Sequence, residues 1–381
     1  MKIAFLTPEY PHFKTGSSGG IGTSIKNLAK GLLQENCQVR VLVYGQREDA
    51  VFDDEGITIE QIQNVKFKGL SWYLTRKKIE RVINQLYLEK EIDLVEAPDW
   101  TGITSFIKPE RCPVVIKLHG SDTYFCHLDN RPVKWKNKFH EKRALQNADA
   151  LLSVSQFTAD KTNKVFGLQK QFTIIPNSID IASFVPNTLI KELSNTVLYF
   201  GSLIRKKGLL ELSFIFNELV KLNPTVKLIL VGKDVPDIIS GSGSTWEMMQ
   251  ALFSQQALSH VSYLGSVPYH EIQKYITEAT VCVFPSFAEA LPVSWIEAMA
   301  MQKAVVASDI GWATDVIDSD IHGFLVHPKD HLEYAFKINL LLSNALLRKE
   351  FGISAREKTI RKFSISVVAQ QSLEFYKRVI Q

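Results

Sequence analysis

Residues 197–219 read VLYFGSLIRKKGLLELSFIFNEL: a short apolar run, a loop bounded by glycines, and a segment with apolar residues at helical spacing. Residues 2–33 repeat this order, with the apolar run KIAFLT over Lys2–Thr7, the loop GSSGGIG over Gly16–Gly22 and a helical pattern over Thr23–Leu33. Strand, loop and helix in this order are typical of the start of a parallel α/β sheet. Two such starts predict two doubly wound domains.

Both halves continue with apolar runs that alternate with helical stretches. The runs are Val39–Tyr44, Leu94–Ala97, Val114–Leu118, Ala150–Val154, Lys227–Val231, Val261–Leu264, Val281–Phe284 and Ala304–Ala307. The alternation predicts two parallel sheets with helices on both faces. We expect a first domain over 1–185, a second over 190–364, and a last helix over 365–381 that packs back on the first domain. Ligands of such sheets bind beyond the carboxyl ends of the strands, so the expected active site is a cleft between the two facing domains.

The composition is that of a folded, water-soluble protein. Of 381 residues, 45% are hydrophobic and 22% are charged, which excludes a disordered chain. The net charge of +4 is too small to indicate nucleic-acid binding. The four cysteines show no C-x-x-C spacing, so we expect buried thiols and no zinc site. Neither an export signal nor a membrane span is recognisable, which favours a cytoplasmic location.

Two loops are candidates for anion binding. The backbone N–H groups around Gly20 open a predicted helix, although glycines that only make a tight turn explain this loop equally well. The loop matches neither a P-loop nor G-x-G-x-x-G, so it favours neither ATP nor NAD. In the second loop, Arg205, Lys206 and Lys207 are three adjacent cations that either extend into solvent or surround a diphosphate.

Residues 284–301 (FPSFAEALPVSWIEAMAM) combine a strand end, a turn and a helix that we expect to start near Pro292. Glu289 and Glu297 lie eight positions apart, so both can reach one ligand at the helix start. Carboxylates accept hydrogen bonds from vicinal hydroxyls, which favours a sugar or ribose. The backbone N–H groups of Ala290 and Leu291 can bind a phosphate. The alternative is one charge at a helix N-terminus and one surface glutamate.

The chain resembles the retaining glycosyltransferases of family four, which have the GT-B fold of two facing Rossmann-like domains. The resemblance covers nearly the whole sequence. It rests on the N-terminal glycine-rich loop, His119-Gly120 after a strand, Pro176–Asp180 (PNSID), the loop Gly201–Gly208, and the pair Glu289 and Glu297.

The resemblance implies a role for each matched position. Lys207 binds the donor diphosphate, Glu297 holds the nucleotide ribose, and Glu289 contacts the hydroxyls of the donor sugar. His119 is the active-site histidine beside the transferred sugar, and residues near Val267 line the base slot.

Two positions depart from the family's pattern. Ser202 stands where an arginine is usual, so we infer that Arg205 supplies that charge. Ala290 replaces a common glycine, which narrows the sugar pocket slightly.

The implied reaction moves a hexose, with glucose as the first choice, from a UDP-sugar to a saccharide or lipid-linked saccharide with retention. Cations and helix N-termini stabilise the leaving diphosphate, so we expect neither a metal nor a cofactor. One alternative is a mannosyltransferase that uses GDP-mannose. Others are a nucleotide-sugar epimerase and a non-catalytic sugar- or lipid-binding protein of the same fold.

Residues 131–143 (RPVKWKNKFHEKR) are strongly basic and contain two aromatic residues, Trp135 and Phe139. The cations are Arg131, Lys134, Lys136, Lys138, Lys142 and Arg143, against the single acid Glu141. A second cluster, Arg76–Arg81, follows Trp72-Tyr73. Such segments predict a peripheral contact with anionic lipid at the inner face of a membrane, unless they are only solvated helix faces.

Overall fold

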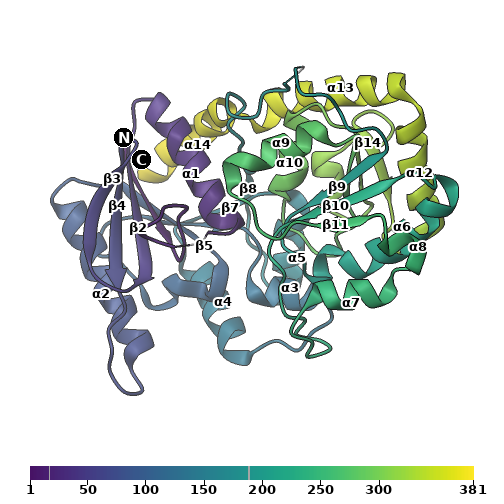
Figure 1. The fold of residues 1–381 in the computed structure, drawn as a ribbon. Coiled ribbons are helices and arrows are strands. Elements are labelled where there is room, and N and C mark those ends of the chain that lie inside the picture. The colour runs from purple at the N-terminus through teal and green to yellow at the C-terminus, as the bar shows by residue number, and fades with distance from the viewer. Residues whose placement is uncertain (17, 188) are drawn as a thin grey trace. The chain divides into compact units, whose positions relative to one another are not determined.

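The computed structural model describes residues 1–16, 18–187 and 189–381, so Ser17 of the expected first loop lies outside the described residues. The chain forms two compact units (Figure 1). The first consists of Met1–Asp180 together with Phe363–Gln381, and the second of Ile181–Lys362. Each unit is a mainly parallel sheet covered by helices.

The sheet of the first unit has the strand order β3-β4-β2-β1-β5-β6-β7-β8. The strands are β1 (Lys2–Thr7), β2 (Gln38–Gln46), β3 (Ala50–Asp54), β4 (Ile57–Gln63), β5 (Leu94–Pro98), β6 (Val114–Leu118), β7 (Ala150–Ser153) and β8 (Thr173–Ile174). β1 pairs in parallel with β2 on one side and with β5 on the other, so the strand order reverses there. The edge strand β3 pairs antiparallel with β4.

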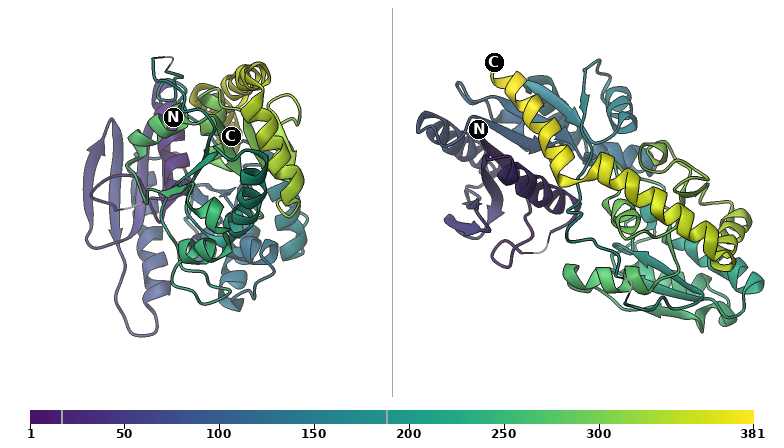
Figure 2. Two further views of the ribbon diagram at one scale, coloured as in Figure 1. Left: turned by 45° about the vertical axis from the view of Figure 1, so that its right-hand side comes forward. Right: turned by 90° about the horizontal axis from the view of Figure 1, so that it is seen from above.

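Helices cover both faces of this sheet. They are α1 (Gly20–Gln34), α2 (Ser71–Leu88), α3 (Asp122–Leu128), α4 (Trp135–Asn147), α5 (Gln156–Phe166) and α14 (Ile365–Ile380), with the 3-10 helix η1 (Trp100–Phe106). α14 lies beside α1 in the right-hand view of Figure 2. Gly31 of α1 permits this approach, because a Cβ there would lie 2.6 Å from the carbonyl oxygen of Ile365.

The core between the sheet, α1 and α14 is built mainly of apolar side chains. Ile3 and Phe5 of β1 pack in it with Val368 of α14. Within this core the phenol of Tyr376 donates a hydrogen bond of 2.6 Å to Glu96 on β5. The last helix of the chain is therefore attached to the first unit by both apolar contacts and a buried hydrogen bond.

The second unit has a fully parallel sheet with the strand order β11-β10-β9-β12-β13-β14. The strands are β9 (Thr196–Phe200), β10 (Lys227–Val231), β11 (Val261–Tyr263), β12 (Val281–Phe284), β13 (Val305–Ser308) and β14 (Gly323–Val326). The helices are α6 (Leu209–Leu222), α7 (Thr245–Leu252), α8 (Gln255–Leu258), α9 (Ile272–Glu278), α10 (Val293–Ala300), α11 (Ala313–Val316), α12 (His331–Ser343) and α13 (Ala345–Phe363), with the 3-10 helices η2 (Arg205–Lys207) and η3 (Tyr269–Glu271).

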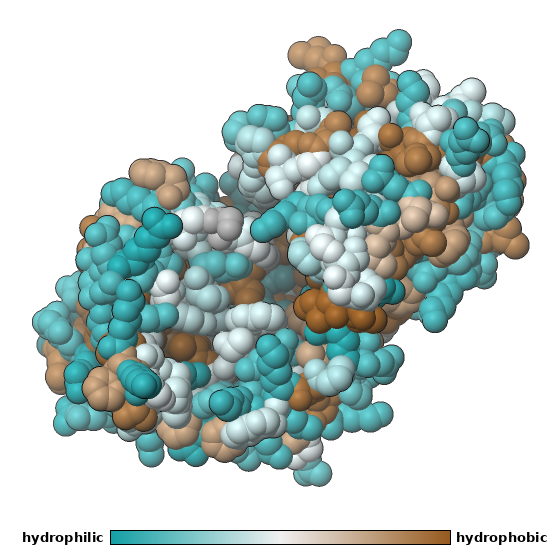
Figure 3. Space-filling model, turned by 60° about the horizontal axis from the view of Figure 1, so that its bottom comes forward, coloured by the Kyte–Doolittle hydropathy of each residue, from teal (hydrophilic) through white to brown (hydrophobic). Residues whose placement is uncertain are grey.

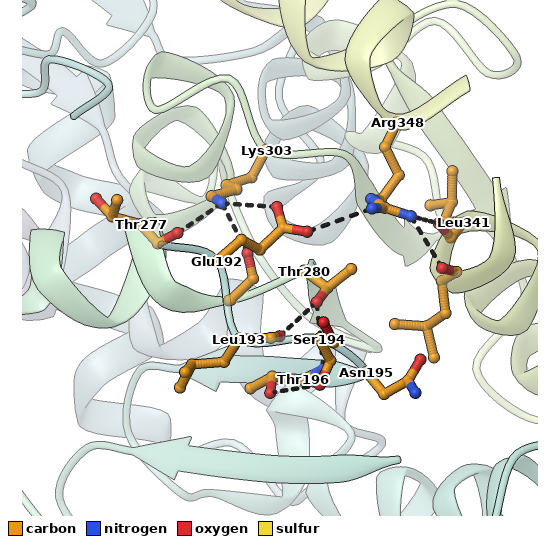
Figure 4. Close-up of polar contacts among 12 residues, drawn as sticks. Glu192, Leu193, Ser194, Asn195, Thr196, Thr277, Thr280, Lys303, Leu341 and Arg348 are labelled. Carbon is orange, nitrogen blue, oxygen red and sulfur yellow. Dashed lines mark hydrogen bonds and ion pairs between the residues drawn. The ribbon is translucent and has the colours of Figure 1, made fainter. Parts of the chain in front are cut away.

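A charged cluster closes the amino-terminal edge of this second sheet (Figure 4). The ammonium group of Lys303, just before β13, donates to two carbonyl oxygens at the end of α9, at 2.7 and 2.8 Å. The guanidinium of Arg348 donates to two carbonyl oxygens at the end of α12, at 2.7 and 2.9 Å. Glu192 lies between the two cations, at 3.4 Å from Lys303 and 3.3 Å from Arg348. The cluster therefore satisfies the ends of two helices at the edge opposite the carboxyl ends of the strands.

The first domain ends earlier than the sequence predicts. We expected it to end at residue 185, but the second unit begins at Ile181. Phe184 belongs to the second unit: its carbonyl oxygen accepts a hydrogen bond of 2.7 Å from Arg356, and its ring lies 5.9 Å from that of Tyr269.

Candidate active site

The loops that follow the neighbouring strands β9 and β12 bring Lys207 and Glu289 together. The ammonium group of Lys207 lies 2.8 Å from Oε1 of Glu289, and the hydroxyl of Ser286 donates to the same oxygen at 3.2 Å. The backbone joins the loops as well, because the N–H of Phe287 donates to the carbonyl oxygen of Lys206 at 2.8 Å. Gly208 has a φ of +71°, and a Cβ there would collide with the backbone of the second loop. The local backbone thus fixes the ion pair at the carboxyl edge of the sheet.

Glu297 lies inside α10, where it is 5% exposed, and Glu289 is 8% exposed. The alternative, in which one of the two is a surface glutamate, is therefore wrong, because both side chains are buried. The phenol of Tyr269 on η3 donates to Oε1 of Glu297 at 2.5 Å. Burial raises the pKa of Glu297 to about 7, against the opposing effects of the Tyr269 hydrogen bond and the charge of Lys207. A carboxylate with this pKa changes its charge near neutral pH.

Arg205 lies on the same turn as Lys207 but is bound to Asp237. The guanidinium forms a bidentate pair with the carboxylate, with distances of 2.9 and 2.7 Å. This pair holds the pKa of Asp237 well below its usual range. A diphosphate contact from Arg205 would have to share or break this pair, whereas Lys207 directly faces Glu289.

The other predicted donor contacts lie at element ends. Ala290 and Leu291 are buried directly before Pro292, the N-cap of α10. Val267 is half-buried in the segment between β11 and η3. Gly20 is the first residue of α1 in the first unit, with nothing within 4 Å of the position where a Cβ would stand.

His119 follows β6 in the first unit. Its backbone N–H donates to Oδ1 of Asp99 at 2.8 Å, so Asp99 fixes the chain at the point where the histidine leaves the strand. Burial and the nearby charge of Lys117 lower the pKa of His119 to about 3. The imidazole is therefore neutral at physiological pH and can form hydrogen bonds without carrying charge. Burial also raises the pKa of Asp99 to about 7.

The basic segment 131–143 is only partly a free cationic surface. Its single acid, Glu141, is buried, and its carboxylate accepts the backbone N–H groups of Asp122 and Thr123 at 3.0 and 3.2 Å. Arg131 pairs with Asp129 at 3.0 Å. Arg143 is exposed, but its guanidinium donates to the carbonyl oxygen of Ser105 at 2.8 Å. The exposed residues at the start of α4 are Lys134, Trp135, Lys136, Lys138 and Phe139, which we call the α4 surface.

The second basic cluster does not form the cationic face that the sequence suggests. Arg76 is buried and donates to the carbonyl oxygen of Trp72 at 3.0 Å. Lys77 pairs with Glu80 at 2.8 Å, and Lys78 pairs with Asp49 at 2.6 Å. Of the four cations, two are therefore neutralised locally, one is inside the unit and Arg81 is exposed.

Over the described ranges 1–16, 18–187 and 189–381, no helix is long and apolar enough to cross a membrane. Within the same residues, no group of three His, Cys, Asp or Glu side chains is arranged to hold a metal ion.

Two family models together match almost the whole chain. The model of Glycosyltransferase Family 4 matches residues 18–183, and that of Glycosyl transferases group 1 matches residues 180–358, which includes Lys207, Glu289 and Glu297. The chain is a family 4, group 1 glycosyltransferase. One relative of this glycosyltransferase is the alpha-maltose-1-phosphate synthase of Mycolicibacterium smegmatis, which is 25% identical over 100% of both chains.

Solved structures share the fold of this glycosyltransferase. A sucrose-phosphate synthase from Thermosynechococcus elongatus has a TM-score of 0.79 at 18% identity, covering 100% of this chain and 99% of the other. Anabaena Alr3699/HepE, in a complex with UDP-glucose, has a TM-score of 0.76 at 21% identity, covering 99% and 100%. The fold is therefore GT-B, with two Rossmann-like domains, as the sequence predicts.

Three residues at these sites were missed by the sequence reasoning. Asp99 directly follows the strand β5, and the expectation that ligands bind beyond the carboxyl ends of the strands could have drawn attention to it. Asp237 lies in an irregular connection and Tyr269 lies on the short 3-10 helix η3, and nothing in their local sequence indicates their partners.

Proposed function

We propose that this glycosyltransferase transfers a hexose, with glucose as the first choice, from a UDP-sugar with retention and without a metal ion. The observation that carries the proposal is the cation Lys207 beside the buried carboxylate Glu289, with Glu297 on the adjoining helix. The related Anabaena protein was solved as a complex with UDP-glucose, which supports the choice of donor.

In this proposal the bond between the anomeric carbon and the phosphate oxygen breaks as the acceptor oxygen bonds to the same face of that carbon. The acceptor proton passes to the departing diphosphate. Lys207 compensates the charge that develops on the diphosphate, and it acts strongly because it is held in place before the reaction. Glu289 then accepts hydrogen bonds from sugar hydroxyls, and Glu297 accepts them from the ribose. We assign His119 a hydrogen bond to the transferred sugar in its neutral form.

A thermal-shift screen tests the donor assignment, because a ligand that binds only the folded protein raises its melting temperature. We expect UDP and UDP-glucose to raise it, and Lys207→Met to abolish the rise. Stabilisation by GDP compounds alone would make this a GDP-sugar enzyme, for which GDP-mannose is the alternative donor. If no nucleotide had an effect, the non-catalytic alternative would replace the proposal.

Product analysis tests the reaction itself. Labelled UDP-glucose is incubated with a panel of saccharide acceptors, and the anomeric configuration of the product is read by NMR. We expect a product with the configuration of the donor. An inverted product would refute retention, and an altered nucleotide-sugar without transfer would favour the epimerase.

For the acceptor we propose a lipid-linked saccharide, with the α4 surface against anionic lipid. Trp135 is 72% exposed and Phe139 is 49% exposed. They lie among lysines whose only acidic neighbour on the helix, Glu141, faces inward. Figure 3 shows one face of the molecule, on which hydrophobic groups lie in small patches among hydrophilic ones.

Sedimentation with liposomes tests this contact. We expect binding to anionic vesicles at low salt and none to neutral vesicles. Each lysine near such a surface contributes ~1 kcal/mol, so the double variant Lys136→Gln/Lys138→Gln should bind roughly thirtyfold more weakly. The matched control is Lys227→Gln/Lys329→Gln, which removes two exposed lysines of the second unit. Equal losses in both variants would show a net-charge effect and would refute a contact through α4.

A further inference from the structure

Tyr269 connects the surface of the second unit to the buried carboxylate of Glu297. Its side chain is 51% exposed, and it lies on the three-residue helix η3, none of whose residues is buried. Its hydroxyl nevertheless reaches Oε1 of Glu297 at 2.5 Å, although Glu297 is only 5% exposed. The phenol thus supplies an O–H donor to a carboxylate that is otherwise shielded from water.

In the proposed function, the same carboxylate accepts hydrogen bonds from the ribose hydroxyls. A phenol O–H and a sugar O–H are the same kind of donor, and either can donate to a carboxylate oxygen. We propose that Tyr269 and a donor ribose hydroxyl compete for Oε1 of Glu297, so that donor binding displaces the phenol. This inference rests on the proposed function and adds a residue that sets the affinity for the nucleotide.

The surroundings of Tyr269 permit the displacement. The residue belongs to a short surface helix with no buried residue, and turning the phenol outward gives up the contact of its ring with that of Phe184, 5.9 Å away. The side chain also has a use before the donor binds. A buried carboxylate without a hydrogen bond is costly, and the phenol satisfies Glu297 and favours its ionised form. The ribose hydroxyl then exchanges one hydrogen bond for another.

The alternative to competition is that Tyr269 keeps its hydrogen bond to Glu297 and positions the carboxylate for the ribose. Both relations predict that Tyr269→Phe changes nucleotide binding, but they predict opposite signs. Removal of a competitor strengthens the binding of a nucleotide that carries ribose hydroxyls. Removal of a positioning group weakens it.

The test is calorimetric titration of UDP and 2′,3′-dideoxy-UDP into the wild-type protein, Tyr269→Phe and the control Tyr275→Phe. Tyr275 is a half-buried tyrosine on the next helix, α9. We expect Tyr269→Phe to bind UDP about fivefold more tightly, the factor that corresponds to a net ~1 kcal/mol for one hydrogen bond. We expect no change with dideoxy-UDP, which has no ribose hydroxyl to compete, and none in the control variant.

Each other result overturns the inference. Weaker binding of UDP to Tyr269→Phe would make the phenol a positioning group, and unchanged binding would remove its role. If Tyr269→Phe gained as much affinity for dideoxy-UDP as for UDP, the phenol would not compete with a ribose hydroxyl. These three results leave the proposed function intact, whereas failure of UDP, GDP and ADP to bind any of the proteins would refute both. Circular dichroism of each variant checks that it is folded.

Discussion

Replacing Glu297 with glutamine should stabilise the protein above neutral pH while it damages the donor site. The variant keeps the shape of the side chain, and its amide oxygen can still accept from Tyr269. Burial raises the pKa of Glu297 from 4.5 to about 7, so the folded protein holds this proton more tightly than the unfolded chain does. Between these two pKa values the folded state binds more protons than the unfolded state, and its stability therefore falls as the pH rises.

The magnitude follows from the two pKa values. Above pH 7 the buried charge costs the folded state about 3 kcal/mol relative to the neutral acid, and below the unfolded pKa this cost is absent. Glu297→Gln has no charge to bury, so its free energy of unfolding should exceed that of the wild type by up to ~3 kcal/mol at pH 8. At pH 4 the two proteins should differ little, since the wild-type side chain is then neutral.

Urea unfolding of both proteins at pH 4 and pH 8 measures this difference, with the fluorescence change of the second unit followed separately where two transitions are seen. The exposed Glu350 supplies the control variant Glu350→Gln, which should change stability by less than ~0.5 kcal/mol at either pH. UDP affinity should fall in Glu297→Gln at pH 8. A loss of stability at pH 8, or the same effect at both pH values, would refute the reasoning that burial dominates the energetics of this carboxylate.

Three further changes test separate parts of the structure. Glu289→Gln should lower turnover roughly a hundredfold or more, because it misplaces the sugar, and should leave UDP affinity within about threefold; a comparable loss in UDP affinity would remove the division of roles between the carboxylates. Gly31→Ala should lower the free energy of unfolding by ~1–3 kcal/mol, because its Cβ meets the backbone of α14. The control Gly243→Ala, whose Cβ lies in open space, should be nearly neutral. Equal melting temperatures for the two variants would contradict this prediction. Glu192→Gln removes the carboxylate that faces Lys303 and should cost ~1 kcal/mol in urea unfolding, less at high salt; an effect that did not change with salt would mean that packing and not charge is responsible.

The sheets could be predicted because their sequence signals are local. Each buried parallel strand is an apolar run of a few residues, and each glycine-bounded loop marks where a strand passes into a helix. The hairpin of β3 and β4 was not predicted, because β3 (AVFDD) is a short and partly exposed edge strand with two acidic residues. The proximity of Lys207 and Glu289 has a simple origin, because Lys207 follows β9, Glu289 follows β12, and these two strands are neighbours in the sheet.

Pairings between distant loops could not be predicted from the sequence. Arg205 and Asp237 are 32 positions apart, and only the folded path of the loop after β10 brings them together. The charge of the segment Arg76–Arg81 was overestimated for the same reason, since the partner Asp49 and the burial of Arg76 depend on tertiary packing. A count of charges measures composition, whereas the surface potential depends on which charges are paired.

The position of α14 has a consequence for how the chain folds during synthesis. The helix supplies Val368, Ala369 and Tyr376 to the core of the first unit, but the ribosome makes it only after the whole second unit. At ~5–20 residues per second, the sheet face that α14 covers waits roughly ten to forty seconds for its helix. During that time an apolar face and the carboxyl of Glu96 lack their cover, which makes the nascent chain a natural client for a chaperone. The domain that is synthesised first is therefore completed last.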